Sequence, residues 1–152
     1  AVRTRDDALA LRDRLLFVGL NPSPVSVEAG HYHQGRLGRT FWRRLMLAGI
    51  LPPATPVETA DDALLAEGHG ITDLSKAVSA RDEATDRALT AGVGPLWQKI
   101  AIWRPAAIVF IYKRAAAIAR TAVPQPMSAT FTARTPFRSS RSSARRHPLV
   151  VP

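Results

Sequence analysis

The sequence contains no cysteine among its 152 residues. A disulfide framework, a thiolate zinc site and a cysteine-bound iron–sulfur cluster are therefore excluded. Long hydrophobic runs are also missing, because no window approaches the roughly eighteen consecutive apolar residues of a transmembrane helix. Residues 1–14 mix charged residues with Ala and Leu and do not resemble a signal peptide. We therefore expect a cytoplasmic protein with no membrane partner.

Acidic residues are absent from the C-terminal part of the chain. All twelve Asp and Glu residues fall within residues 1–86, which carry a net charge of −2. Residues 87–152 carry eleven Lys or Arg and a net charge of +11, which gives the formal net charge of +9 for the whole chain. Such asymmetry indicates a surface that faces a polyanion, because neutralised phosphates release counterions. A basic tail that only keeps the protein in solution is the alternative that charge alone leaves open.

Metal-binding and phosphate-binding motifs are sparse. Of the four histidines, only His31 and His33 lie close together. A pair spaced by two residues, without a third clustered ligand, is weak evidence for a metal ion. Neither a GxxxxGK[ST] nor a GxGxxG motif occurs. We therefore expect no metal site and no cofactor.

Short apolar runs alternate with amphipathic segments along the chain. LLFVG (15–19) and AAIVFIY (106–112) are typical of buried strands, and GITDL (70–74) of a brief strand. Helices are expected at 40–50 with Thr40 as its cap, at 61–67, in pieces over 83–103 with interruptions at Gly92, Gly94 and Pro95, and at 113–122. This alternation favours an α/β fold, a three-layer αβα arrangement with a short, mostly parallel central sheet of about four strands. Residues 1–152 are expected to form one domain, since no repeat or linker is evident.

Candidate site residues follow the expected strands. In parallel α/β folds, ligands bind beyond the carboxyl ends of the strands. Asn21, Asp73 and the pair Tyr112–Lys113 come at those places. A carboxylate at Asp73 can orient or deprotonate a water, or stabilise a developing positive charge. A helix cap or an ordinary loop residue is the structural alternative for Asp73.

Asn21 lies in an unusual local sequence, LLFVGLNPSP. Gly19 allows the backbone to come close to another group, and Pro22 and Pro24 restrict how the chain leaves the strand. Such a platform is suited to aiming one amide, which can orient a water through its carbonyl oxygen without being a strong base. The alternative is an Asn that only satisfies a turn.

The motifs together resemble a known family. GLNPSP, then GHYHQGRLGRTFWRRLMLAGI at 30–50, GITDL at 70–74 and AIVFIYKRAAAIA at 107–119 follow in order over roughly residues 15–120. They are similar to the mismatch-specific uracil/thymine-DNA glycosylases of the uracil-DNA glycosylase superfamily. The resemblance implies that Asn21 activates the water that attacks C1′ of the deoxyribose. It also implies that Leu20, through its backbone, and Ser23 help to form the base pocket.

The same resemblance implies roles for an aromatic ring and for basic residues. Counting from Gly30 places His33 where the family stacks a ring on the flipped base, with Tyr32 as the close competitor. Lys113 matches the family's Lys after the third strand. Phe41 and Trp42 are expected to lie in the core, since they offer large areas to bury.

The family's second motif, a loop that penetrates the duplex, is not evident. Residues 133–152 form either a basic Arg/Ser-rich tail or a divergent DNA-contacting loop, and the preceding FTARTPF is a poor strand. Within this stretch, contacts to DNA are expected from Ser142, Ser143 and Arg145.

These residues together predict a monomeric, nucleoid-associated DNA repair enzyme. Its partner would be double-stranded DNA with mismatched or damaged bases, and its reaction the hydrolysis of the N-glycosidic bond of uracil, with thymine and other damaged bases as further candidates. No Lys nucleophile is required, so the enzyme would be monofunctional and leave an abasic site. Two other classes stay open: a non-catalytic nucleic-acid-binding module that has lost the second motif, and a small α/β protein that binds a free nucleotide.

Overall fold

The protein is described by a computed structural model that covers residues 14–80 and 84–124. Three parallel strands form the sheet in this part of the chain: β1 (Leu15–Gly19), β2 (Gly70–Asp73) and β3 (Ala107–Phe110). Their order is β2-β1-β3, so β1 is hydrogen-bonded on both sides. The α/β class and the parallel sheet are confirmed. The expected fourth strand, at FTARTPF, lies outside the described residues.

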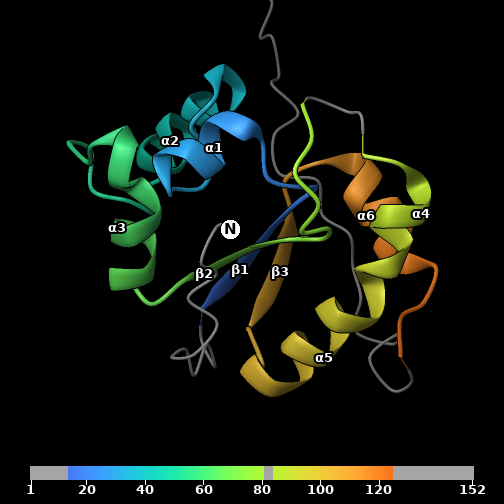
Figure 1. Cartoon of the computed structure of the whole chain (residues 1–152). Coiled ribbons are helices and arrows are strands. Elements are labelled where there is room, and N and C mark those ends of the chain that lie inside the picture. Colours follow the sequence, from blue (N-terminus) through green and yellow to red (C-terminus); the bar gives the residue numbers. More distant parts are fainter. Residues whose placement is uncertain (1–13, 81–83, 125–152) are drawn as a thin grey trace, which may run out of the picture.

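Helices cover both faces of the sheet (Figure 1). One layer holds α1 (Pro24–Ala29), α2 (Arg36–Leu47), the 3₁₀ turn η1 (Val57–Thr59) and α3 (Ala60–Ala66). The other layer holds α4 (Asp86–Ala91), α5 (Val93–Trp103) and α6 (Lys113–Arg120). The three-layer arrangement is therefore confirmed for the described residues. No helix in the described ranges has the length and apolar character needed to cross a bilayer.

The central strand β1 contributes to two cores because successive side chains point to opposite faces of a sheet. Phe17 packs with Trp42, Leu45 and Leu64 beneath α2 and α3. On the other face, Leu16 and Val18 belong to a second cluster with residues of α4, α5 and α6. The continuous apolar run LLFVG is thus explained by burial on both sides, and Trp42 is in the core as expected.

Three expectations about the elements were wrong in detail. A short helix, α1, follows the first strand, because Pro24 occupies the first turn, where its missing N–H costs nothing. Helix α2 begins at Arg36 with Gly35 as its cap, and Thr40 lies in the helix, donating its hydroxyl to the Arg36 carbonyl. The sequence does not reveal this start, because Leu37, the apolar side chain of the first turn, is exposed.

The last strand and the Gly/Pro interruptions also differ from expectation. β3 is an edge strand of the described sheet and only Phe110 in it is buried, so it is not the fully covered strand that its apolar sequence predicts. Gly92 does separate two helices, whereas Gly94 and Pro95 fall in the first turn of α5. Proline is tolerated there because first-turn N–H groups have no helical partner.

Candidate active site at the carboxyl ends of β1 and β2

Asn21 lies two residues beyond the end of β1 with its side-chain amide fixed. Its Nδ2 donates to Ser79 Oγ at 2.8 Å and to the backbone carbonyls of Ser79 and Pro22, each at 3.3 Å. Because carbonyl oxygens only accept hydrogen bonds, these contacts assign the nitrogen end of the amide. Within residues 14–80 and 84–124 no hydrogen bond uses Oδ1, so the amide oxygen can accept a hydrogen bond from a water.

The loop after β2 runs beside the Asn21 loop and is bonded to it by the backbone. The N–H groups of Leu74 and Ser75 donate to the carbonyls of Gly19 and Leu20, at 3.0 and 2.8 Å. Ser79 N–H donates to the Pro22 carbonyl at 3.2 Å. Ser79 is a site residue that the sequence did not reveal, because a serine in a loop 58 positions away from Asn21 carries no local signal.

Asp73 ends β2 directly opposite Gly19 in the parallel register. The residue is 6% exposed, and its Oδ1 has no hydrogen-bond partner among the described residues. Burial raises the pKa of Asp73 to about 6, although the nearby Lys76 charge acts in the opposite direction. A carboxyl group with a pKa near 6 is well suited to proton transfer close to neutral pH. An unpaired buried carboxylate is costly, which argues for a chemical rather than a structural role.

His33 reaches the same spot from the loop before α2. A Cβ atom added to Gly19 would collide with Asp73 Oδ1 and would lie 3.2 Å from His33 Cε1. The imidazole and the carboxylate therefore converge over the Gly19 backbone, and only glycine leaves them room. Burial lowers the pKa of His33 to about 4, so its ring is neutral at physiological pH. Its Nε2 is buried without a hydrogen-bond partner in the described part of the chain.

The backbone of His33 is held in the left-handed region, with φ of 54°. This conformation is unusual for a residue other than glycine and needs support from its surroundings. Gly38 of α2 supplies one support, because any Cβ there would collide with the His33 carbonyl. The ring packs against Phe41 and Trp42, at centroid distances of 5.1 and 6.0 Å.

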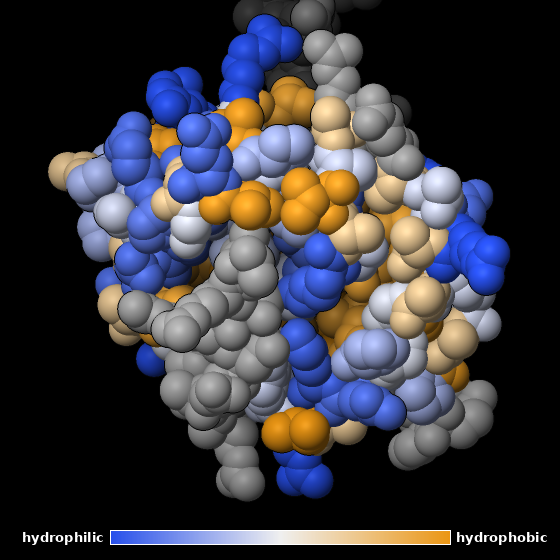
Figure 2. Space-filling model, in the orientation of Figure 1, coloured by the Kyte–Doolittle hydropathy of each residue, from blue (hydrophilic) through white to orange (hydrophobic). Residues whose placement is uncertain are grey.

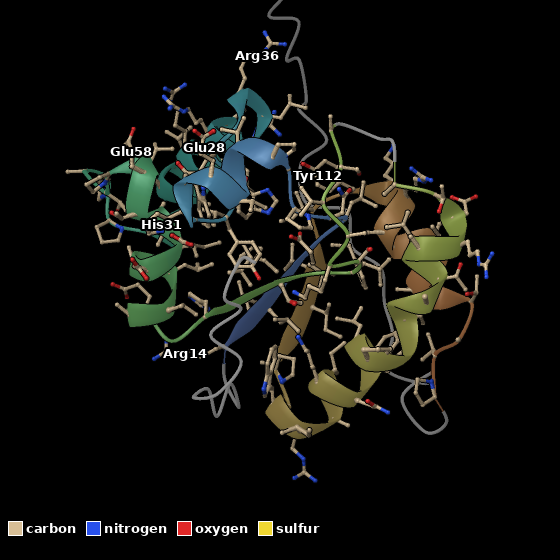
Figure 3. All side chains as sticks on the ribbon, viewed as in Figure 1. Arg14, Glu28, His31, Arg36, Glu58 and Tyr112 are labelled. Carbon is tan, nitrogen blue, oxygen red and sulfur yellow. The ribbon has the colours of Figure 1, made fainter. Side chains whose placement is uncertain are left out.

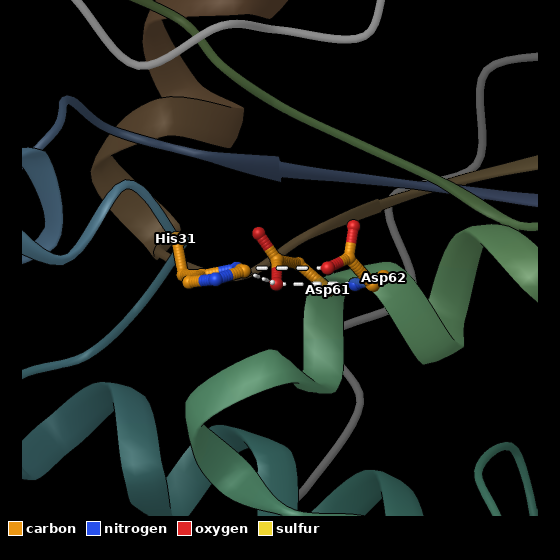
Figure 4. A group of neighbouring side chains, drawn as sticks. All are labelled: His31, Asp61 and Asp62. Carbon is orange, nitrogen blue, oxygen red and sulfur yellow. Dashed lines mark hydrogen bonds and ion pairs between the residues drawn. The ribbon is translucent and has the colours of Figure 1, made fainter.

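Asp61 of α3 anchors the same loop from the other side (Figure 4). Its Oδ2 accepts the Tyr32 N–H at 3.0 Å, and its Oδ1 lies 2.8 Å from His31 Nδ1. Asp62 lies next to this pair, and the three side chains form a group that offers ligand atoms to a cation. Since both oxygens of Asp61 already accept hydrogen bonds from the protein, the group's visible role is to fix the loop that carries His33.

The other residues expected at the site surround this centre. Tyr32 is buried in the core, and its carbonyl accepts hydrogen bonds from Trp42 Nε1 and Gln34 Nε2. Of the two rings, that of His33 is the one that approaches Gly19. Leu20 also packs its side chain in the core, and Ser23 caps α1 by accepting the Ser26 N–H. The base contacts expected of these three residues stay predictions.

Basic groups lie farther out. Lys113 is exposed at the start of α6, which follows the carboxyl end of β3 as Asn21 follows that of β1. It is next to Tyr112, which is labelled in Figure 3. A hollow of about 320 Å³ opens on the α4–α5 side of β2, with Lys76 and Lys99 among its lining residues. Ser142, Ser143 and Arg145, expected to contact DNA, lie outside the described residues.

The site thus combines an aimed amide, a buried carboxyl group with a raised pKa and a neutral imidazole, all beyond the ends of two adjacent strands. A family model of the uracil-DNA glycosylase superfamily matches residues 7–147, nearly the whole chain. A search of curated proteins found no match. The chain belongs to the uracil-DNA glycosylase superfamily, whose members act on DNA as glycosylases, hydrolases of DNA repair.

Proposed function

We propose that this protein excises uracil from mismatched duplex DNA, with G·U as the preferred pair and thymine or other damaged bases as further substrates. The observation that carries the proposal is the fixed Asn21 amide, at the same strand ends as the Asp73 carboxyl group, with an oxygen that has no partner among the described residues. The motifs GLNPSP and GHYHQ, which resemble the mismatch-specific branch, support the choice of substrate.

In the proposed reaction, a water bound by Asn21 Oδ1 attacks C1′ of the deoxyribose. The N-glycosidic bond breaks, its electron pair leaves with the base, and the sugar passes through a state with cationic character. Asp73 in its carboxylate form stabilises that charge and accepts a proton from the water. The base leaves as an anion and takes up a proton from solvent, and Asp73 releases its proton, so the products are the free base and an abasic site. No lysine takes part as a nucleophile, so the enzyme is monofunctional.

His33 is proposed to contact the extruded base. A base must leave the duplex to be reached, at a cost of a few kcal/mol that is smallest for a mispair. The neutral ring beside Gly19 offers an apolar face against which the base can stack, offsetting part of that cost. Leu20, Ser23 and Tyr32 would complete the base pocket, and Lys113, with Ser142, Ser143 and Arg145, would contact the DNA backbone.

The enzyme is proposed to act as a monomer on chromosomal DNA in the cytoplasm, associated with the nucleoid. The net charge of +9 favours a polyanionic partner. A non-catalytic DNA-binding module is the alternative: it would need the basic surface but not the chemistry of Asn21.

A single-turnover cleavage assay tests the proposal. Duplexes with one G·U, A·U, G·T or G·hypoxanthine pair, and single-stranded uracil DNA, are incubated with the protein, treated with hot alkali and resolved on a gel. We expect the fastest cleavage at G·U. Asn21→Ala should lower the rate by about 100-fold or more, as for loss of a group that acts in the transition state, and leave DNA affinity within about twofold.

Asp73→Asn should also reduce the G·U rate strongly, and Asp86→Asn is its matched control. Asp86 is an aspartate at the start of α4 whose side chain is 79% exposed and which lies outside the proposed mechanism. Normal turnover by Asn21→Ala would contradict the role proposed for its amide. Absence of cleavage by the wild-type protein, together with salt-sensitive DNA binding, would overturn the proposed activity and favour the binding module.

A further inference from the structure

Exposed apolar side chains occur in the segments next to the candidate site. The described part of the chain exposes five large hydrophobic residues: Val25, Leu37, Leu47, Val78 and Ile102. Val25, Leu37 and Val78 come from three segments that border Asn21 and His33. Exposed apolar groups gathered at one place mark a contact surface more often than scattered ones do.

Hydrogen bonds connect these segments to the site. Val78 directly precedes Ser79, which holds the Asn21 amide. Val25 is in α1, where Ser26 Oγ accepts the backbone N–H of Gln34 at 3.1 Å. The carbonyl of Gln34 in turn accepts a hydrogen bond from Arg39 Nε, in the first part of α2. The segments that carry these apolar residues are therefore tied by hydrogen bonds to Asn21 or to the loop between α1 and α2 that carries His33.

Leu37 is the most exposed of the three, at 69%, and it lies between two arginines. Arg36, Leu37 and Arg39 are all exposed within the first four residues of α2, and α2 contains no acidic residue. Figure 3 shows Arg36 projecting outward at the top of the molecule, and in Figure 2 apolar side chains lie beside strongly hydrophilic ones along that upper part. We call Arg36, Leu37 and Arg39 the α2 edge.

We propose that the α2 edge contacts duplex DNA beside the extruded nucleotide, with Leu37 against the exposed face of the neighbouring base pair and Arg36 and Arg39 on flanking phosphates. This inference rests on the proposed function, because it assumes that a base enters the site. Extrusion leaves a gap in the stack, and apolar side chains inserted at such steps offset the loss of stacking. A leucine between two guanidinium groups fits an apolar gap bordered by phosphates.

A protein partner is a weaker candidate for the same surface. Arg43 and Arg44 extend the positive charge along α2, and the helix itself contains no acidic residue. The edge also directly follows the His33 loop, and Gly38 within it lies against the His33 backbone. Charge complementarity and continuity with the site both favour DNA.

Binding to a preformed gap tests the surface without requiring catalysis. Fluorescence anisotropy compares two duplexes: one with a tetrahydrofuran abasic analogue opposite G, and the same duplex with an intact G·C pair. Leu37→Ser should weaken binding to the gapped duplex about five- to tenfold and binding to the intact duplex less than twofold. Leu47→Ser is the matched control, because Leu47 is 86% exposed at the far end of the same helix.

Excision rates and salt dependence complete the experiment. Leu37→Ser should slow G·U excision from duplex and leave single-stranded uracil excision unchanged, since a single strand has no gap to fill. The double variant Arg36→Gln/Arg39→Gln should reduce the slope of log K against log salt by about 2, close to 0.9 for each lost phosphate contact. Arg104 lies just before β3, at the amino ends of the strands, and Arg104→Gln should leave the slope unchanged.

The outcomes separate the surface from the activity. Equal binding of the gapped duplex by wild type and Leu37→Ser, or an equal loss on both duplexes, overturns the inference. Lack of DNA binding by the wild-type protein overturns it as well and points to a protein partner. Absence of excision together with a selective Leu37→Ser defect on the gapped duplex supports the α2 edge while rejecting the proposed function.

Discussion

Asn21 and Ser79 show how a single side chain becomes directional through its neighbours. The pattern GLNP identifies Asn21 as a candidate, because it lies two residues after Gly19, at the end of a strand, and is followed by Pro22. The direction of its amide depends on Ser79, whose hydroxyl and carbonyl both accept hydrogen bonds from Nδ2. The first feature is local and readable in the sequence, whereas the second is a contact between distant loops.

Ser79 is therefore predicted to be a positioning residue. Ser79→Ala removes the 2.8 Å hydrogen bond to Asn21 and should lower the single-turnover excision rate about three- to tenfold, the usual worth of one such bond. The dissociation constant for DNA should stay the same, because the amide acts on the water and not on the duplex. Rapid-quench assays measure the rate and anisotropy measures the binding.

Ser79→Thr keeps a hydroxyl at the same place and should restore most of the rate. A purely structural Ser79 would show instead a loss of folding stability with no change in the rate of the folded fraction. An unchanged rate in Ser79→Ala would contradict the positioning role.

At the scale of elements, the sequence predicted types better than boundaries. LLFVG, GITDL and AAIVFIY all form strands, since short apolar or β-branched runs have few alternatives. The start of α2 was missed because its first turn is exposed and polar, and α1 because two prolines suggested an irregular segment. The site depends on these missed turns: α1 supplies Ser26, and the first turn of α2 supplies Gly38.

Gly38 lies where a helix would ordinarily favour alanine. Alanine is a better helix former than glycine by about 1 kcal/mol, yet a Cβ at this position would collide with the His33 carbonyl. Gly38→Ala should therefore destabilise the protein by about 1–3 kcal/mol, as expected for overpacking, and should move His33 away from Gly19. Urea unfolding measures the first effect, and the excision rate measures the second.

Gly94 provides the comparison for this variant. It is also helical, in the first turn of α5, but nothing lies within 4 Å of an added Cβ. Gly94→Ala should be neutral or stabilising by up to about 1 kcal/mol. Equal effects of the two substitutions would show that the His33 loop does not need the close approach of Gly38.

At the scale of the whole molecule, burial shifts the pKa values of two site residues, Asp73 and His33, in opposite directions. Asp73 has a folded-state pKa of about 6, above its ordinary 3.8, so its contribution to the free energy of unfolding falls as pH rises between these values. His33 has a folded-state pKa of about 4, below its ordinary 6.5, so its contribution rises with pH over that window. The two trends oppose each other between about pH 4 and pH 6.

Asp73→Asn should remove the contribution of Asp73 to the pH dependence of stability and leave that of His33. At pH 8 the variant should be more stable than wild type, by at most about 3 kcal/mol, because a buried charge is removed. Between pH 4 and 6.5 its stability should rise with pH more steeply than that of wild type, since only the His33 trend is left. Urea unfolding followed by tryptophan fluorescence from pH 4 to 8 measures both, and lower stability of Asp73→Asn at pH 8 would contradict the assignment.

The central place of β1 has a consequence for how the protein can adapt to a substrate. Both edges of β1 are hydrogen-bonded to parallel neighbours, and its two faces are covered by separate cores. Amide hydrogens in such a strand exchange with solvent only through large-scale opening. Any induced fit around an extruded nucleotide must therefore occur in α1, the His33 loop and the segment that carries Ser79, while Gly19 serves as the fixed point against which those parts adjust.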